Sequence, residues 1–157
     1  MITIIAIGKN KDKALQSLER EYAKRLQSFS KVEILEVKDE PNDHVEREGQ
    51  VNLIKLKEAE RVLSKIKPDD FVVLLDLHGK MWTSEQFAKN LNDWQMRHSH
   101  IVFVIAGSLG PDISLVNRAD IRWKLSDLTF THLMTRTLIL EQIYRAFTII
   151  HNRSYHK

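Results

Sequence analysis

Two short stretches decide the fold of this 157-residue chain: FVVLLDL at residues 71–77 and IVFVI at residues 101–105. Both are nearly continuous runs of β-branched, aromatic and other apolar residues, and the first contains one aspartate. A strand that is covered on both faces carries such a run, whereas a half-exposed strand alternates apolar and polar residues. The two stretches therefore predict central strands of a parallel sheet with helices on both faces.

The segments around these strands alternate between strand and helix patterns. Ser84 is a good N-cap for the helix that follows it, and Pro68 ends the helix before it. This alternation predicts an α/β sandwich with a mostly parallel sheet, folded as a single domain over residues 1–157. The expected strands are 2–7, 32–37, 71–77, 101–105 and 123–125; the expected helices are 14–26, 50–66, 84–96 and 132–150, with a short helix beginning at Pro111 and a loop at 38–48.

The composition excludes several classes of protein. Hydrophobic residues make up 43% and charged residues 29%, a globular mixture rather than a disordered one. The absence of cysteine excludes disulfides, thiolate zinc sites and a cysteine nucleophile. The first residues lack a signal-peptide pattern and no apolar run reaches membrane-spanning length, so we expect a cytoplasmic protein with no membrane partner. Residues 79–157 carry 10 Lys and Arg against 6 Asp and Glu, which favours a polyanionic partner for this half.

Three segments follow predicted strands and contain small or polar residues: LDLHGK at 75–80, IAGSLG at 105–110 and LSDLTFTH at 125–132. Ligands of open parallel sheets bind outside the carboxyl ends of the strands, so these segments are the candidate site. The glycine pattern is neither that of a dinucleotide-binding loop nor that of a P-loop. An ordinary strand-to-helix turn explains the glycines of the middle segment equally well.

Other polar residues indicate little chemistry by themselves. His98 and His100 have no evident third ligand, so we expect surface histidines and no metal site. No Ser-His-Asp order or carboxylate pair indicates a hydrolase. His132 either caps its helix or contacts a ligand. Arg136 is expected near the site, where it could meet an anion, whereas Arg145 is expected to be solvated.

The last helix, residues 132–150, is apolar over a wide arc. Such a helix is normally covered on two sides, so we expect it to pack on its own sheet and also to form a homodimer. The alternative is a helix that is merely central in its own chain. Its two neighbouring stripes are Leu133, Leu140, Ile143, Phe147 and Ile150, and Met134, Leu138, Ile139, Ala146 and Ile149.

The order and spacing of several motifs give a resemblance that covers the whole chain. These motifs are IAIGK at 5–9, LDLHGK at 75–80, VIAGSLG at 104–110, LSDLTF at 125–130, EQIYRAF at 141–147 and YHK at 155–157. With them, the chain resembles the ribosomal RNA large subunit methyltransferase H family of the SPOUT class. The resemblance implies a homodimer with a C-terminal trefoil knot that uses S-adenosylmethionine. It implies methylation of N3 of a pseudouridine in the helix 69 loop of 23S rRNA, in assembled ribosomes.

The resemblance also assigns site residues. The tail residues Tyr155 and His156 match the lining on the substrate side, near the cofactor of the partner subunit. We expect His156 to act as the general base, Arg136 to favour the anionic form of the target base, and Tyr155 to stack on it or hydrogen-bond to it. The cofactor contacts implied are Leu75, Ala106, Gly107, Leu125, Ser126, Asp127, Leu128, Thr129 and Phe130.

Two residues depart from the family pattern. Ala106 replaces a usual glycine, which requires a negative φ at this position. Thr131 replaces a usual proline and predicts a less rigid loop. Two rival interpretations stay open: a non-catalytic flavodoxin-like nucleotide-binding module, and a ribosome-associated protein that has lost activity.

Overall fold

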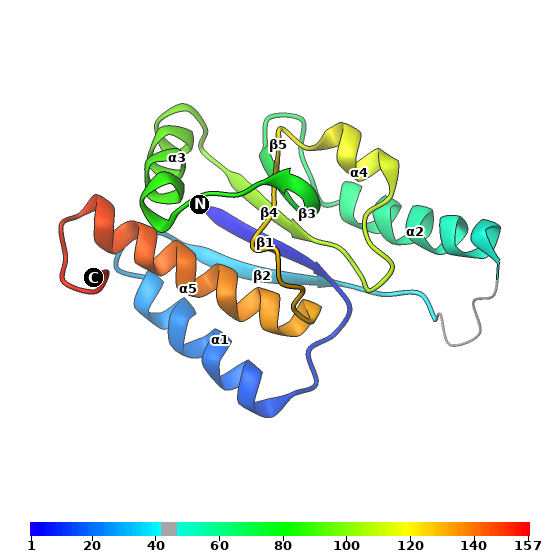
Figure 1. The fold of residues 1–157 in the computed structure, drawn as a ribbon, viewed down its shortest axis with the longest axis horizontal. Coiled ribbons are helices and arrows are strands. Elements are labelled where there is room, and N and C mark those ends of the chain that lie inside the picture. Colours follow the sequence, from blue (N-terminus) through cyan, green and yellow to red (C-terminus); the bar gives the residue numbers. More distant parts are fainter. Residues whose placement is uncertain (42–46) are drawn as a thin grey trace.

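The computed structural model describes residues 1–41 and 47–157, which form one sheet with helices on both faces (Figure 1). The strand order is β2-β1-β4-β3-β5 and every pair of neighbours is parallel. The predicted α/β architecture with a parallel sheet is therefore confirmed. The strands are β1 (Ile2–Ile7), β2 (Val32–Val37), β3 (Phe71–Lys80), β4 (Ile101–Ile105) and β5 (Ile121–Trp123).

The helices divide between the two faces of the sheet. Helices α1 (Lys13–Leu26), α3 (Ser84–Arg97) and α5 (His132–Ile150) cover one face, with α5 in contact with both α1 and α3 (Figure 1). Helices α2 (Glu48–Leu63) and α4 (Ile113–Arg118) cover the other face. The central position of α5 explains why Ile139 and Ala146, from its second apolar stripe, are buried within the chain's own core.

The continuous apolar runs have a direct structural reason. In β4, Ile101, Phe103 and Ile105 point into the core under α1, α3 and α5, whereas Val102 and Val104 point into the core under α2 and α4. Because successive side chains of a strand alternate between faces, a strand covered on both faces must be apolar at every position. The apolar residues of β1 divide in the same way, with Thr3 as its one polar residue, and both strands have the predicted bounds.

Several predicted boundaries were wrong by a few residues. The last strand lies at residues 121–123 rather than 123–125, and α2 spans Glu48–Leu63 rather than 50–66. The N-cap of α3 is Thr83, not Ser84: its hydroxyl accepts from the Gln86 N–H while the Gln86 side chain accepts from the Thr83 N–H. Pro111 precedes α4, whose N-cap is Asp112. The predicted loop at 38–48 lies partly outside the described residues.

The far end of β3 departs from a regular strand. Leu75 and Lys80 both pair with Trp123 of β5, so residues 76–79 form an excursion between them. Gly79 lies directly on the backbone of β5: a Cβ there would be 2.6 Å from the Arg122 carbonyl carbon and oxygen. Within the described part of the chain, no helix has the length and apolarity needed to cross a membrane.

Candidate functional site

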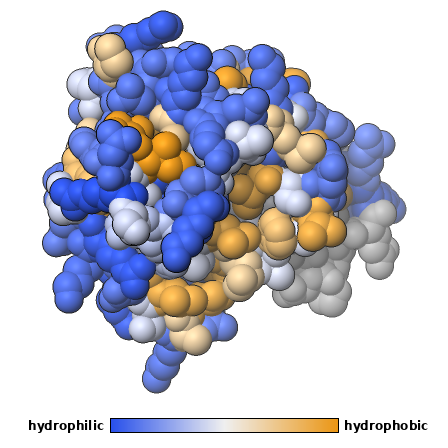
Figure 2. Space-filling model, turned by 60° about the vertical axis from the view of Figure 1, so that its left-hand side comes forward, coloured by the Kyte–Doolittle hydropathy of each residue, from blue (hydrophilic) through white to orange (hydrophobic). Residues whose placement is uncertain are grey.

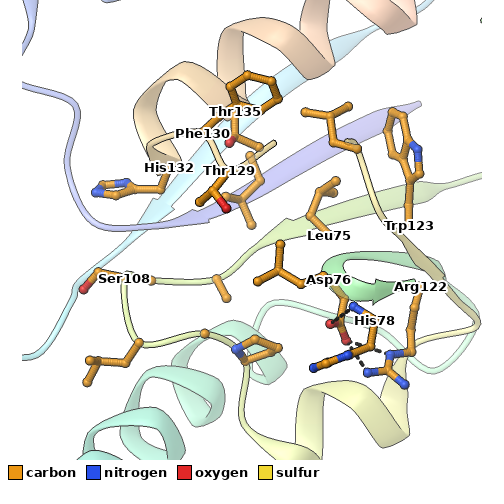
Figure 3. Close-up of a pocket in the computed structure, with 18 of the residues that line it drawn as sticks. Leu75, Asp76, His78, Ser108, Arg122, Trp123, Thr129, Phe130, His132 and Thr135 are labelled. Atoms are coloured by element: carbon orange, nitrogen blue, oxygen red, sulfur yellow. Dashed lines mark hydrogen bonds and ion pairs between the residues drawn. The ribbon is translucent and has the colours of Figure 1, made fainter. Parts of the chain in front are cut away.

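A cavity of about 700 Å³ lies at the carboxyl ends of β4, β3 and β5 (Figure 3). We call it the main cavity. It is lined by the end of β3, by the loop after β4, by the segment between β5 and α5, and by the first turn of α5. The three segments that the sequence placed at strand ends therefore meet around one cavity, as expected for an open parallel sheet. Of the proposed cofactor contacts, those on its wall are Leu75, Ala106, Gly107, Leu125, Ser126, Leu128, Thr129 and Phe130.

The loop after β4 comes close to a buried carboxylate. A Cβ at Gly107 would be 2.9 Å from Oε1 of Glu58 on α2, so a side chain at this position would displace the end of the Glu58 side chain. Glu58 is only 4% exposed, and its carboxylate accepts from the Glu40 N–H at 3.1 Å. Burial raises the pKa of the Glu58 carboxyl, against the opposing hydrogen bond from Glu40. The Glu58 carboxyl therefore lies directly behind the glycine that lines the main cavity.

The neighbouring Ala106 meets the condition set by the sequence. Among the described residues, Asn152 is the one non-glycine residue with a positive φ, so Ala106 keeps a backbone conformation that a Cβ tolerates. Gly110, in the same loop, has a φ of 88° and is free of contacts that a Cβ would disturb. Its conformation, rather than crowding, requires glycine there.

A polar group forms one side of the main cavity. Asp76 accepts a hydrogen bond from Arg122 Nε at 2.6 Å and another from the His78 N–H at 2.9 Å (Figure 3). Asp76 is 7% exposed, so its charge needs this partner. The pair joins the excursion of β3 to β5 and fixes the wall of the cavity between them.

The segment between β5 and α5 forms another wall. Thr131 is the N-cap of α5, with its hydroxyl accepting from the Met134 N–H at 3.3 Å, so threonine supplies a cap at the position where the family usually has proline. Asp127 does not line the main cavity but forms an exposed ion pair with Lys124. Leu77, Leu128 and Phe130 are exposed by 64%, 71% and 38%, and together they give the main cavity an apolar rim.

His132 begins α5, so it is not the helix cap. It lines the main cavity and also a second hollow beside it. Its Nδ1 is buried and has no hydrogen-bond partner within the described residues. Burial, followed by the positive charge of Arg136, lowers the pKa of the imidazole, so the ring is neutral near pH 7.

Arg136 is placed differently from the sequence expectation. Its side chain is fully buried and does not line the main cavity. It donates to Glu36 Oε2 at 2.5 Å and to the Gly8 carbonyl at 2.7 Å. Arg136 therefore connects α5 to the ends of β1 and β2, and in this chain it does not reach an anion in the cavity.

Tyr155 and His156 fold back onto α5 and α3, away from the main cavity of their own chain (Figure 1). The Tyr155 hydroxyl donates to Glu141 at 3.0 Å, and the Arg145 guanidinium lies 4.8 Å from the centre of the Tyr155 ring. Arg145 donates to His156 Nδ1 at 3.1 Å, while Nε2 of that ring is 2.7 Å from Glu85. We call Glu141, Arg145, Tyr155 and His156 the tail cluster. Figure 2 shows this side of the molecule, where hydrophilic side chains surround separate apolar patches.

The tail cluster contains residues that sequence reasoning missed. Arg145 was expected to be solvated, but it pairs with Glu141 one helical turn before it and packs on the tail. The spacing of Glu141 and Arg145, four residues apart on a helix, was the available signal. His100 was also expected at the surface, yet it bridges Asp70 at 2.7 Å and Thr3 at 2.8 Å at the opposite edge of the sheet.

Comparison with known proteins gives the class first. The family model described as "Predicted SPOUT methyltransferase" matches residues 1–156, so the chain belongs to that family. A structure described as a probable methylase family protein from Haemophilus influenzae Rd KW20 has the same fold. It superposes with a TM-score of 0.56 at 12% identity, over 99% of this chain and 70% of the other.

Relatives of higher sequence identity indicate which kind of methyltransferase the chain resembles. A ribosomal RNA large subunit methyltransferase H from Ruminiclostridium cellulolyticum is 47% identical over 157 residues, covering 99% of each chain. The protein of the same name from Acetivibrio thermocellus is 45% identical over 159 residues, again with 99% coverage of each. The family resemblance seen in the sequence is thereby confirmed.

Proposed function

We propose that the chain transfers a methyl group from S-adenosylmethionine to N3 of a pseudouridine in the helix 69 loop of 23S rRNA, in the assembled ribosome. The observation that carries this proposal is the main cavity, whose wall contains every proposed cofactor contact except Asp127. The relatives named as large-subunit ribosomal RNA methyltransferases, similar over their full length, support large-subunit ribosomal RNA as the substrate.

The residues of the main cavity fit this cofactor. A volume of about 700 Å³ lies within the range of small-molecule sites. Leu75, Leu125 and Phe130 offer apolar surface for an adenine ring, and the backbone of 106–107 and 125–129 offers donors and acceptors. The Glu58 carboxylate behind Gly107 suits a ligand with a positive charge. When bound, the cofactor supplies a methyl group on a positively charged sulfur.

On the RNA side, N3 of the base must lose a proton before its lone pair can attack. The N3–methyl bond forms as the methyl–sulfur bond breaks, and the proton goes to a base, for which we propose His156. In the tail cluster His156 Nδ1 already accepts from Arg145, so accepting the proton requires release of one of its contacts. The Arg145 charge beside Tyr155 would favour the anionic base, a role that the buried Arg136 cannot perform here.

The separation between the main cavity and the tail cluster of one chain favours a homodimer. Glu141 follows His132 by nine residues, about 14 Å along the helix, and no tail-cluster residue lines the main cavity of its own chain. A second copy would bring its tail to this cavity. The exposed apolar rim at Leu77, Leu128 and Phe130, with Met134 beside it, is our candidate for part of the contact.

The path from β5, at the edge of the sheet, back to the central α5 passes the excursion of β3, which favours the C-terminal trefoil knot that the resemblance implies. Ribosomes as substrate imply a cytoplasmic enzyme. For Arg136 we propose a positioning role, holding the first turns of α5 and hence the cavity wall at His132 and Thr135.

Titration calorimetry tests the cofactor assignment. We expect S-adenosylmethionine to bind, with no heat from flavin mononucleotide or ATP, and Gly107→Val to abolish the signal because its side chain meets Glu58. Gly49→Ala, at a position with open space around it, is the folded control and should bind normally. Binding of flavin but not S-adenosylmethionine would favour the flavodoxin-like module instead.

A further inference from the structure

The second hollow beside the main cavity contains an unexplained group of lysines. Lys9, Lys11 and Lys38 line it, together with Gly8, Asp39 and His132. We call it the lysine hollow. None of the three lysines forms an ion pair with another described residue, and all three are exposed.

The sheet register brings these lysines together. Ile7 pairs with Val37 in the parallel ladder, and the Gly8 N–H donates to the Val37 carbonyl at 2.8 Å. Lys9 and Lys38 therefore leave neighbouring strands at the same edge of the sheet. This is the edge at which β4, β3 and β5 form the main cavity, because all the strands are parallel.

The lining carries three lysines and three carboxylates, those of Asp12, Glu36 and Asp39. Asp12 accepts from the Ala14 and Leu15 N–H groups at the start of α1. Glu36 accepts from Arg136 and from the Asn10 N–H. Counting the Arg136 guanidinium that pairs with Glu36, four cations stand against the three carboxylates of the hollow, an excess of one positive charge. This balance suits a phosphate, whose oxygens accept from several ammonium groups at once.

His132 connects the hollow to the main cavity. It lines both, and Figure 3 shows its ring directed away from Leu75 and Asp76, on the side of the cavity where α5 begins. A Cβ on Gly8 would be 3.7 Å from His132 Cε1, so the imidazole lies close to the loop that carries Lys9 and Lys11. A polymer bound at the main cavity could continue past His132 into the hollow.

We infer that the lysine hollow binds the phosphate backbone of the RNA strand that carries the target nucleotide. This inference rests on the proposed function and adds a surface for the substrate. Contacts of lysines with phosphates position a nucleic acid and release counterions, so their contribution shows as a salt-dependent affinity rather than as sequence preference.

The test compares two triple variants of equal charge. Lys9→Gln, Lys11→Gln and Lys38→Gln remove the hollow's cations. Lys31→Gln, Lys65→Gln and Lys67→Gln remove exposed lysines that precede β2 and β3, at the opposite edge of the sheet. For each protein, binding to large ribosomal subunits that lack the modification is measured across a series of KCl concentrations, with calorimetry of S-adenosylmethionine alongside.

We expect the hollow variant to bind subunits about tenfold or more weakly at 100 mM KCl, with a salt slope smaller by about 2–3 than that of the wild type. The control variant should keep the wild-type slope, and both should bind S-adenosylmethionine normally. Equal slopes and affinities for the two variants would overturn the inference. A wild-type protein that methylates no subunits would instead overturn the proposed function, so the two failures are distinguishable.

Discussion

At Gly79 the absence of a side chain is required by packing rather than by backbone conformation. The excursion of β3 passes so close to β5 that a Cβ would meet the Arg122 backbone at 2.6 Å and the Trp123 nitrogen at 2.7 Å. Backbone atoms of a paired strand cannot rotate away as a side chain can. The contact therefore determines how tightly residues 76–80 wrap around the edge strand, and through Asp76 it determines the shape of the main cavity.

We expect Gly79→Ala to lower the free energy of unfolding by about 1–3 kcal/mol, as overpacking does. For a chain of this size the midpoint of thermal unfolding should fall by about 2–10 °C. Gly49→Ala is the matched control: it lies in α2 with open space around it and should leave the midpoint unchanged or raise it. Equal midpoints for the two variants would show that the excursion can move aside.

Glu58 predicts a pH dependence whose sign follows from burial. Because burial raises the pKa of its carboxyl in the folded state, the folded state holds the proton more strongly than the unfolded state does. Its contribution favours folding below the ordinary carboxyl pKa and is lost as pH rises through the folded-state value. Glu58→Gln should therefore be more stable than the wild type at pH 7, and the difference should shrink towards pH 4 in urea unfolding. A difference that grows on acidification would contradict the raised pKa.

At the scale of elements, the end of α5 determines where the tail lies. Asn152 has a φ of 54°, the Asn152 N–H donates to the Ile149 carbonyl, and the Arg153 N–H donates to the Thr148 carbonyl at 2.8 Å. This is the hydrogen-bond pattern of a Schellman motif with asparagine in the left-handed position. It reverses the chain so that Tyr155 returns to Glu141.

Asn152→Val should cost about 1–2 kcal/mol, because a β-branched residue is strained at positive φ. Methyl transfer should fall further than stability does, since Tyr155 and His156 lose their position, while S-adenosylmethionine binding stays. Asn152→Gly should retain both stability and activity, as glycine adopts this conformation freely. Thermal unfolding and methyl transfer to ribosomes are measured for both variants. Normal activity in Asn152→Val would contradict the claim that the cap of α5 positions Tyr155 and His156.

Elements differ in how well the sequence predicted them. The bounds of β1, β2 and β4 were correct, since their apolar or alternating pattern is local information. The position of β5 was wrong because Arg122 interrupts its apolar pattern, and the reason for that arginine, Asp76, lies 46 residues earlier. Thr83 and Ser84 are both suitable caps, and only the reciprocal bond with Gln86 decides between them.

Contacts between residues far apart in the sequence also limited how much of the site could be predicted. The cavity residues were predictable because parallel strands bring their carboxyl ends to one edge. The burial of Arg136 was not, because its partners Glu36 and Gly8 are 100 and 128 residues away. Neither was the position of His156, which joins the tail cluster and meets Glu85 across 71 residues. Contacts of this kind depend on the completed fold and leave no spacing in the sequence.

At the scale of the whole molecule, the main cavity and the tail cluster belong together only if two copies associate. We expect a dimer in sedimentation velocity. Leu128→Asp combined with Met134→Asp should shift it towards monomer and abolish methyl transfer, since both side chains belong to the exposed apolar rim and the α5 start. Met96→Asp, at a residue that is 78% exposed near the end of α3, is the control and should remain dimeric. A wild-type monomer with full activity would contradict the shared site.

Methyl transfer to ribosomes is the most direct measurement of what this protein does. Purified protein, labelled S-adenosylmethionine and ribosomes lacking the modification are combined, and the 23S rRNA is digested and examined by mass spectrometry. The proposal predicts a single added methyl group on a pseudouridine of the helix 69 loop, absent with Gly107→Val. Ribosomes that gain no methyl group, or gain it in another RNA segment, while the protein binds the cofactor, would contradict it.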